Sequence, residues 1–145
     1  MWAPKSRTPK RAPRKREKRK HLNKKFYNSA AWRATRKSYI REYQTKIYSE
    51  VTNGYWTIRG GTKLELSPHQ QTVILSYGIP CEICLKLFAA NAYDTMEPGK
   101  ELDHIEPLNA ENALESTDHG NPFDHDNLQL LCFRHHAKKS QRETT

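Results

Sequence analysis

The stretch DNLQLLCFRHHAKK, at residues 126–139, places a cysteine and two adjacent histidines just before a pair of lysines. Its CFRH portion sets Cys132 and His135 three residues apart, and CEIC at residues 81–84 has the same spacing. That spacing lets both members of a pair bind one ion, and the two pairs together supply a tetrahedral shell. We therefore predict a structural zinc ion (Zn2+) held by Cys81, Cys84, Cys132 and His135.

A zinc staple suits a chain that has little apolar material to bury. The chain has 145 residues, of which 35% are hydrophobic, and zinc binding would supply folding free energy that a small core lacks. Two alternatives are that Cys81 and Cys84 form a redox pair, or that Cys132 is only a buried cysteine. Neither explains why the second pair falls beside another dense group of ligands. The odd count of three cysteines also disfavours a disulfide framework.

Positive charge is concentrated at the N-terminus. Residues 1–25 hold 12 Lys or Arg and one acid, whereas residues 26–145 hold 13 basic and 15 acidic residues. Such a run repels itself, buries nothing and gains free energy by displacing counterions from a phosphate backbone. We predict a disordered basic arm at 1–25 that binds nucleic acid; a targeting or solubilising tail is the alternative. The nucleic-acid-binding candidates within it are Arg11, Arg14, Lys15, Arg16, Lys18, Arg19 and Lys20.

The segment at 26–80 has ordinary secondary-structure signals. Asn28 or Ser29 can cap a helix at about 29–50, along which aromatic and aliphatic residues recur at helical spacing and indicate a core face. Its opposite side carries further candidates for phosphate contact: Arg33, Arg36 and Lys37. Turn pairs between residues 51 and 66 predict a hairpin. A capping box from Ser67 to Gln70 predicts a short helix that stops at Gly78.

Beyond Cys81 the sequence resembles a known family. Asp103-His104, followed by DNLQLLCFRHHAKK, looks like the HNH endonucleases, nucleases with a ββα-metal core, in the zinc-stapled form common among phage-encoded proteins. FYNSAAWR, at 26–33, is similar to the helix that precedes that core in phage members. The resemblance implies an α+β fold. In this reading 1–25 is the arm, 26–80 leads into the core, and 81–145 is the nuclease core with its CxxC/CxxH zinc site.

Hydrolysis of a phosphodiester needs a base for the attacking water and positive charge near the phosphate. His104 has an unperturbed pKa near neutrality and is the predicted general base. Asp103 would point to the opposite face of the same strand and hold a divalent ion, Mg2+, Mn2+ or another metal. His136, rotated by about 100° from His135 on a helix, would be the second ligand. The resemblance implies that Asn127 orients the turn carrying His104.

Two alternatives concern the ligands. His136 could join the zinc and His135 the catalytic ion, although Cys132 to His135 has the spacing of the other pair. His119 and His125 could substitute as ligands, but a histidine in a polar loop is usually solvated. The acids around the motif raise local cation affinity and repel DNA, so we expect the arm to supply the attraction to the duplex.

The function implied by these residues is metal-dependent endonucleolytic cleavage of DNA, with double-stranded DNA as the expected partner. The resemblance also implies a phage-encoded protein that could act in DNA packaging beside the terminase. No run approaches the roughly 18 apolar residues of a membrane span, so we expect a cytoplasmic protein, in the host cell if it is phage-encoded. The alternative is a non-catalytic zinc module that binds DNA or RNA through its arm.

Overall fold

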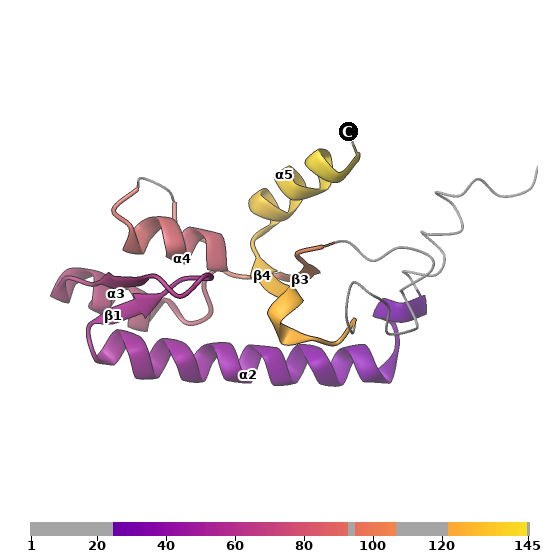
Figure 1. Ribbon diagram of the computed structural model, residues 1–145, viewed down its shortest axis with the longest axis horizontal. Helices are drawn as coiled ribbons and strands as arrows, with labels where there is room; N and C mark the ends of the chain where they lie inside the picture. Colours follow the sequence, from indigo (N-terminus) through magenta and orange to yellow (C-terminus); the bar gives the residue numbers. More distant parts are fainter. Residues whose placement is uncertain (1–24, 93–94, 107–121, 145) are drawn as a thin grey trace, which may run out of the picture.

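The computed structural model describes residues 25–92, 95–106 and 122–144 and has an α+β fold. One long helix, α2, runs along one side of the molecule (Figure 1). Over one end of it lie α3, α4 and the first hairpin, and over the other lie β3, β4 and α5 (Figure 1). The predicted arm at 1–25 lies outside the described residues apart from Lys25. No helix in these described ranges is long and apolar enough to cross a membrane.

Helix α2 spans Ala30–Thr52 and starts at a predicted cap. The Ser29 side chain accepts a hydrogen bond from the Trp32 backbone at 3.1 Å. One face of the helix is apolar because its large side chains recur at helical spacing; the buried residues are Trp32, Tyr39, Tyr43, Ile47 and Val51. The prediction that this aromatic stripe is core is confirmed. The basic residues of the other side are exposed, namely Arg33, Arg36, Lys37 and Arg41.

The predicted hairpin and short helix are also confirmed. Strands β1 (Tyr55–Thr57) and β2 (Lys63–Glu65) pair antiparallel. Helix α3 (Pro68–Tyr77) starts at the expected capping box, in which Ser67 and Gln70 bond each other's backbone, and its C-cap is Gly78. That glycine has φ of 96°, a conformation that costs other residues more.

The C-terminal half contains the ββα unit. Strand β3 (Glu101–His104) pairs antiparallel with β4 (Leu128–Leu131), and α5 (Phe133–Thr144) follows after one residue. A single turn of 3-10 helix, η1 (His125–Asn127), leads into β4. Helix α4 (Glu82–Ala89) begins directly after Cys81 and contacts β4. The fold is therefore the α+β class with a ββα core that the resemblance implies.

A partly buried carboxylate joins the two halves to α2. Glu82 accepts hydrogen bonds from the Tyr39 hydroxyl, at 2.6 Å, and from the Leu130 backbone. Arg59 donates to the same carboxylate and to the Leu128 carbonyl. Burial raises the pKa of the Glu82 carboxyl, and its hydrogen bonds partly oppose that shift. This network fixes β4, and therefore the site that β3 and β4 carry, against the long helix.

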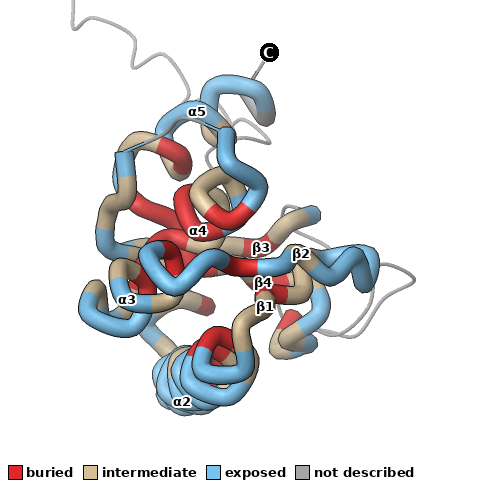
Figure 2. The backbone as a smooth tube through the Cα atoms, turned by 90° about the vertical axis from the view of Figure 1, so that its left-hand side faces the viewer, coloured by how far each residue is buried: buried red, intermediate tan, exposed pale blue. Residues whose placement is uncertain are grey.

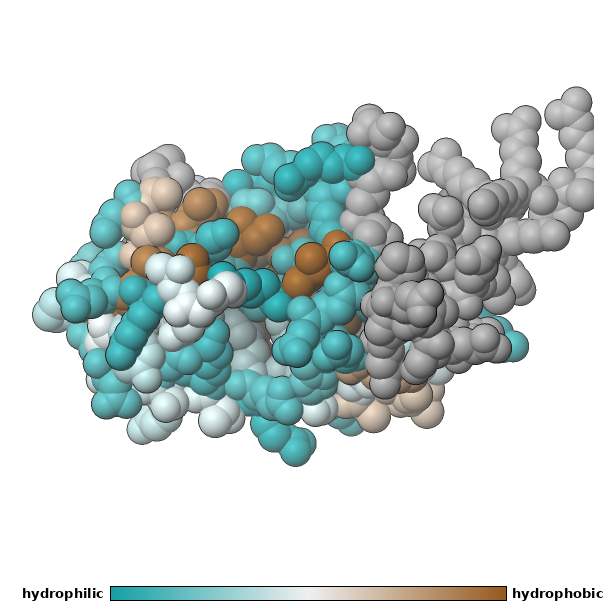
Figure 3. Space-filling view, in the orientation of Figure 1, coloured by the Kyte–Doolittle hydropathy of each residue, from teal (hydrophilic) through white to brown (hydrophobic). Residues whose placement is uncertain are grey.

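The core lies between α2 and the paired strands, where buried segments face one another (Figure 2). The β4 residues Leu128, Leu130 and Leu131 have no exposed surface, and they pack against α2 or against the cysteines. The outer face is mainly hydrophilic, with hydrophobic surface in a few spots near its centre (Figure 3). Strand β4 therefore lies in the dry interior, whereas the face seen in Figure 3 is mainly hydrophilic.

Candidate metal cluster and active site

Four side chains from two segments, residues 81–84 and 132–135, converge between α4, β4 and α5. The Nδ1 atom of His135 lies 3.4 Å from the Cys81 Sγ, 3.5 Å from the Cys84 Sγ and 3.3 Å from the Cys132 Sγ. All four ligand atoms lie within 4.8 Å of one another, and all four residues are buried. With metal–ligand bonds of about 2.0–2.3 Å, a tetrahedral zinc ion needs ligands at about these separations. The Cys3His cluster therefore fits zinc.

The ionisation of the thiols in this cluster depends on a nearby cation. Burial raises the pKa of the Cys84 and Cys132 thiols, because neighbouring sulfurs and an apolar surround disfavour thiolates. A coordinated ion reverses that balance, since a metal-bound thiol is deprotonated. Arg134 adds one positive charge, with its Nη2 3.8 Å from the Cys84 Sγ. Within the described residues this is one closed site with four ligands, the pattern of structural rather than catalytic zinc.

Adjacent residues of β3 enter different environments. His104 is buried with 1% of its surface exposed, whereas Asp103 is partly exposed. Alternation along a strand sends neighbouring side chains to opposite faces, as the sequence predicts. The two side chains therefore lie in different environments, which the prediction of two separate roles requires.

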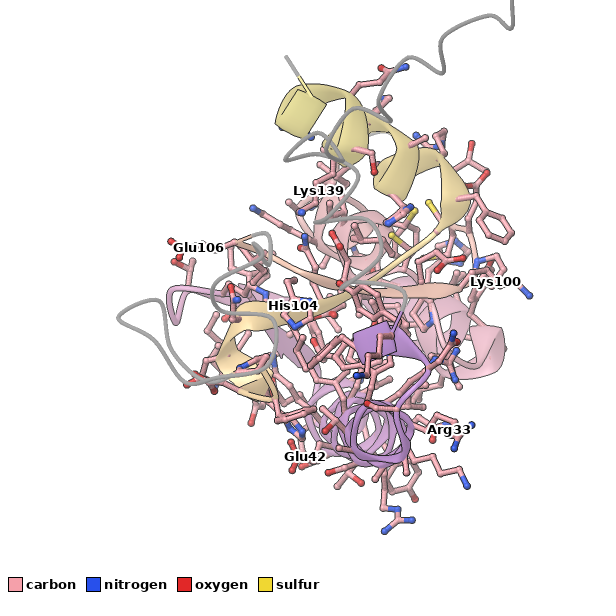
Figure 4. The ribbon with its side chains drawn as sticks, turned by 90° about the vertical axis from the view of Figure 1, so that its right-hand side faces the viewer. Arg33, Glu42, Lys100, His104, Glu106 and Lys139 are labelled. Carbon is pink, nitrogen blue, oxygen red and sulfur yellow. The ribbon has the colours of Figure 1, made fainter. Side chains whose placement is uncertain are left out.

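The His104 ring is held at both nitrogens. Its Nε2 lies 2.7 Å from the Pro122 carbonyl oxygen, which only accepts, so Nε2 carries the proton. Its Nδ1 lies 3.1 Å from the Tyr27 hydroxyl. The Trp32 ring stacks on the imidazole with centroids 5.1 Å apart, and Figure 4 shows His104 deep in the middle of the molecule. Two hydrogen-bond partners and one stacked ring therefore fix the orientation of the imidazole.

Burial is the main cause that lowers the pKa of His104, opposed by the Pro122 hydrogen bond and by Asp103. The expectation of an ordinary pKa near neutrality is thus corrected, because it took no account of burial among aromatic rings. The correction favours the proposed chemistry, since a general base must be neutral before the reaction starts.

Asp103 faces an imidazole and an ammonium group from α5. The His136 Nε2 lies 4.0 Å from one carboxylate oxygen, and the Lys139 Nζ lies 2.8 Å from the other, Oδ2. That Oδ2 is buried and accepts no hydrogen bond of good geometry from the described residues. Figure 4 shows Lys139 on α5, above His104 in that view. A carboxylate beside an imidazole suits a divalent cation, and the Lys139 ammonium occupies part of that place in this structure.

A cleft of about 380 Å³ opens beside this pair. Its lining residues are Tyr27, Trp32, Arg36, Lys100, Glu101, Leu102, Asp103 and His136. Basic groups enter the cleft from α2, at Arg36, and from just before β3, at Lys100. The acidic groups come from β3 itself. The cleft therefore presents both cationic and carboxylate groups.

Asn127 lies at the end of η1 and holds the chain just after His104. Its Oδ1 accepts from the Glu106 backbone at 2.9 Å, and its Nδ2 donates to the Glu106 carbonyl at 3.3 Å. The Asn127 carbonyl also accepts from the Ile105 backbone at 2.7 Å. These three bonds fix the turn that leaves β3, which matches the position the resemblance implies for Asn127.

The structure also places the histidines that were weighed as alternative ligands. His136 faces the cleft and His135 the cysteines, so the two histidines are not exchanged as the alternative assignment allowed. His125 forms an ion pair with Glu42 at 2.6 Å, away from the cysteines. His119 and the arm residues lie outside the described ranges. Figure 4 places Arg33 and Lys100 at the same edge of that view.

Three contacts were not predicted from the sequence. The Tyr27 hydroxyl on His104, the Pro122 carbonyl on the same ring and the Lys139 ammonium on Asp103 all join segments that are distant in the chain. FYNSAAWR offered a signal for the first, since Tyr27 stands in it, and AKK offered one for Lys139. Nothing in the sequence singles out a carbonyl.

A comparison with protein families finds that the family described as HNH endonuclease matches residues 81–142. Comparison with curated proteins and with solved structures finds no match. The matched range contains the Cys3His cluster, both strands of the ββα unit and the residues around the cleft that follow Cys81. Residues 81–142 are therefore similar to the HNH endonuclease family.

Proposed function

We propose that this protein is a metal-dependent endonuclease that hydrolyses DNA phosphodiester bonds, with His104 as general base. One observation carries the proposal: a neutral, oriented histidine lies next in sequence to an acid that faces His136 across a cleft. A pure zinc scaffold would have no use for that arrangement. The HNH endonuclease match supports the reaction class.

Asp103 and His136 would hold the catalytic divalent ion, Mg2+ or Mn2+ or another metal. Such an ion supplies positive charge to the scissile phosphate and to the leaving 3′ oxygen. His104 keeps its proton at Nε2 on the Pro122 carbonyl, so its Nδ1 lone pair is the basic atom. Asn127 positions His104 through the Glu106 backbone and does not touch substrate. Cys81, Cys84, Cys132 and His135 would hold the zinc that fixes α5.

DNA, and duplex DNA first, is the proposed substrate because basic residues line the cleft and fill the arm. Arg36 and Lys100 line the cleft, and Arg33 and Lys37 are exposed on the same helix as Arg36. The arm adds 12 basic residues against one acid. These groups bind backbone phosphates without reading bases, and their contribution falls as salt rises.

The test is conversion of supercoiled plasmid with Mg2+, Mn2+ or EDTA. We expect cleavage by wild-type protein in metal, none in EDTA, and only a small residual rate with His104→Ala. His69→Ala is the matched control, because His69 is exposed on α3 and far along the chain from the cleft residues. A variant lacking residues 1–25 is expected to lose DNA affinity most at low salt. Equal cleavage by His104→Ala and wild type would overturn the assignment of the base.

A second candidate is a non-catalytic zinc module that binds DNA or RNA. The observation in its favour is that His104 is 1% exposed and engaged at both nitrogens. Plasmid that is bound but uncut in every metal would select this candidate. The role in phage DNA packaging beside a terminase, which the resemblance implies, stays a prediction.

A further inference from the structure

Tyr27 lies between the histidine base and the cleft. It lines the cleft together with Asp103 and His136, while its hydroxyl lies 3.1 Å from the His104 Nδ1. His104 is not among the described residues that line that cleft. A water attacking a phosphate beside the Asp103–His136 pair would therefore meet the Tyr27 oxygen before it could meet the imidazole.

The direction of the Tyr27–His104 hydrogen bond follows from the other ring nitrogen. The Pro122 carbonyl accepts from Nε2, so Nδ1 of the neutral ring has a lone pair and the Tyr27 hydroxyl must donate to it. The phenol oxygen keeps lone pairs that can accept a proton from elsewhere. Burial and the nearby Asp103 raise the pKa of Tyr27, which keeps the hydroxyl protonated at rest.

Packing holds Tyr27 in this position. Its neighbour Phe26 is 2% exposed and stacks on Phe123 with centroids 5.3 Å apart. The Tyr27 ring itself meets Phe26 at 5.3 Å and Trp32 at 5.1 Å, both edge to face. Withdrawing Tyr27 from the base would drag these rings into water, a large cost for buried aromatic surface. Because the hydroxyl stays between the cleft and the His104 Nδ1, a proton that passes from the cleft to His104 has to pass through it.

We propose, on the basis of the function proposed above, that Tyr27 is a catalytic residue that relays the proton of the attacking water to His104. As the water oxygen forms its bond to phosphorus, its O–H bond breaks and that proton passes to the Tyr27 oxygen. The original Tyr27 proton passes at the same time to the His104 Nδ1. The P–O3′ bond breaks and the leaving oxygen takes a proton from solvent. His104 then returns its extra proton to solvent.

Tyr27→Phe tests the relay because it removes one hydroxyl and keeps the ring that packs on Phe26 and Trp32. We expect the single-turnover rate of plasmid cleavage to fall by about 100-fold, the lower range for loss of a proton-transfer group. DNA affinity and melting temperature should stay close to wild type. Tyr77→Phe is the matched control, since the Tyr77 hydroxyl donates to the Met96 carbonyl at 2.9 Å, outside the cleft.

Two further measurements separate a relay from a packing role. Tyr27→Phe introduced into His104→Ala should cause no additional loss of rate, because both act in one proton path. In mixtures of light and heavy water, the wild-type rate should depend on deuterium fraction with curvature, as two protons move together. A loss of rate in Tyr27→Phe that adds fully to that of His104→Ala would overturn the relay.

The outcomes distinguish this proposal from the proposed function. Active wild type, inactive His104→Ala and fully active Tyr27→Phe would remove the relay and keep the nuclease. A Tyr27→Phe variant faster than wild type would show that the hydroxyl obstructs the base, which also overturns the relay. Wild-type protein that cuts in no metal would remove the nuclease and the relay together.

Discussion

Two adjacent histidines on α5 belong to two different kinds of site. His135 is 7% exposed and points Nδ1 at three cysteine sulfurs, so its site is closed by four protein ligands. His136 lies at the cleft with one carboxylate near it, so positions remain for water and substrate. Under the proposed function, this one helix would supply both a structural and a catalytic metal site, because successive residues on a helix point about 100° apart.

The largest effect should come from emptying the closed site. Zinc bound to small domains supplies about 10–16 kcal/mol in apparent folding free energy, comparable to the whole stability of a typical domain. Stripping zinc with a strong chelator, or Cys132→Ser, should abolish the cooperative thermal transition measured by circular dichroism. Equimolar zinc should restore it in wild type but not in the variant. An unchanged melting curve after verified zinc removal would show that the cluster is not a staple.

The next effect separates the neighbouring histidines. His136→Ala should retain one zinc per chain, measured by elemental analysis, and a wild-type melting temperature, while cleavage falls by at least about 100-fold, since even outer-shell changes at metal sites cost 10–100-fold. His135→Ala should lose zinc and stability together. If His136→Ala lost the zinc and His135→Ala kept it, the assignment of the two sites would be reversed.

The smallest effect concerns the open site alone. The Lys139 Nζ lies 2.8 Å from the Asp103 Oδ2 and competes with a divalent ion for that oxygen. An ion pair of this kind contributes about 1 kcal/mol at most when partly solvated. Lys139→Met should therefore lower the Mg2+ concentration for half-maximal cleavage by about three- to fivefold and leave zinc content unchanged. A higher Mg2+ requirement would mean instead that Lys139 assists the metal site. Lys138→Met, at an exposed neighbour, is the control.

The sequence predicts the closed site well and the open site incompletely, for physical reasons. CxxC and CxxH spacings define a tetrahedral cluster because ligand reach is local, and the Ser67 capping box defines α3 in the same way. His104 was identified by residue type, but its burial depends on Trp32 and Tyr27, which are more than 70 residues away in the chain. Such contacts depend on how α2 packs on the ββα unit, and no local pattern encodes that packing.

Helix α2 lies outside the segment that matches the HNH family, yet it completes that segment. Trp32 covers one face of His104, and the Tyr39 hydroxyl bonds the Leu128 carbonyl at the start of β4 at 3.0 Å. Residues 81–142 are therefore not a transplantable module: grafted onto another protein, they would lack the side chains of α2 that cover His104 and bond β4. The segment at 81–142 and helix α2 therefore form one structural unit.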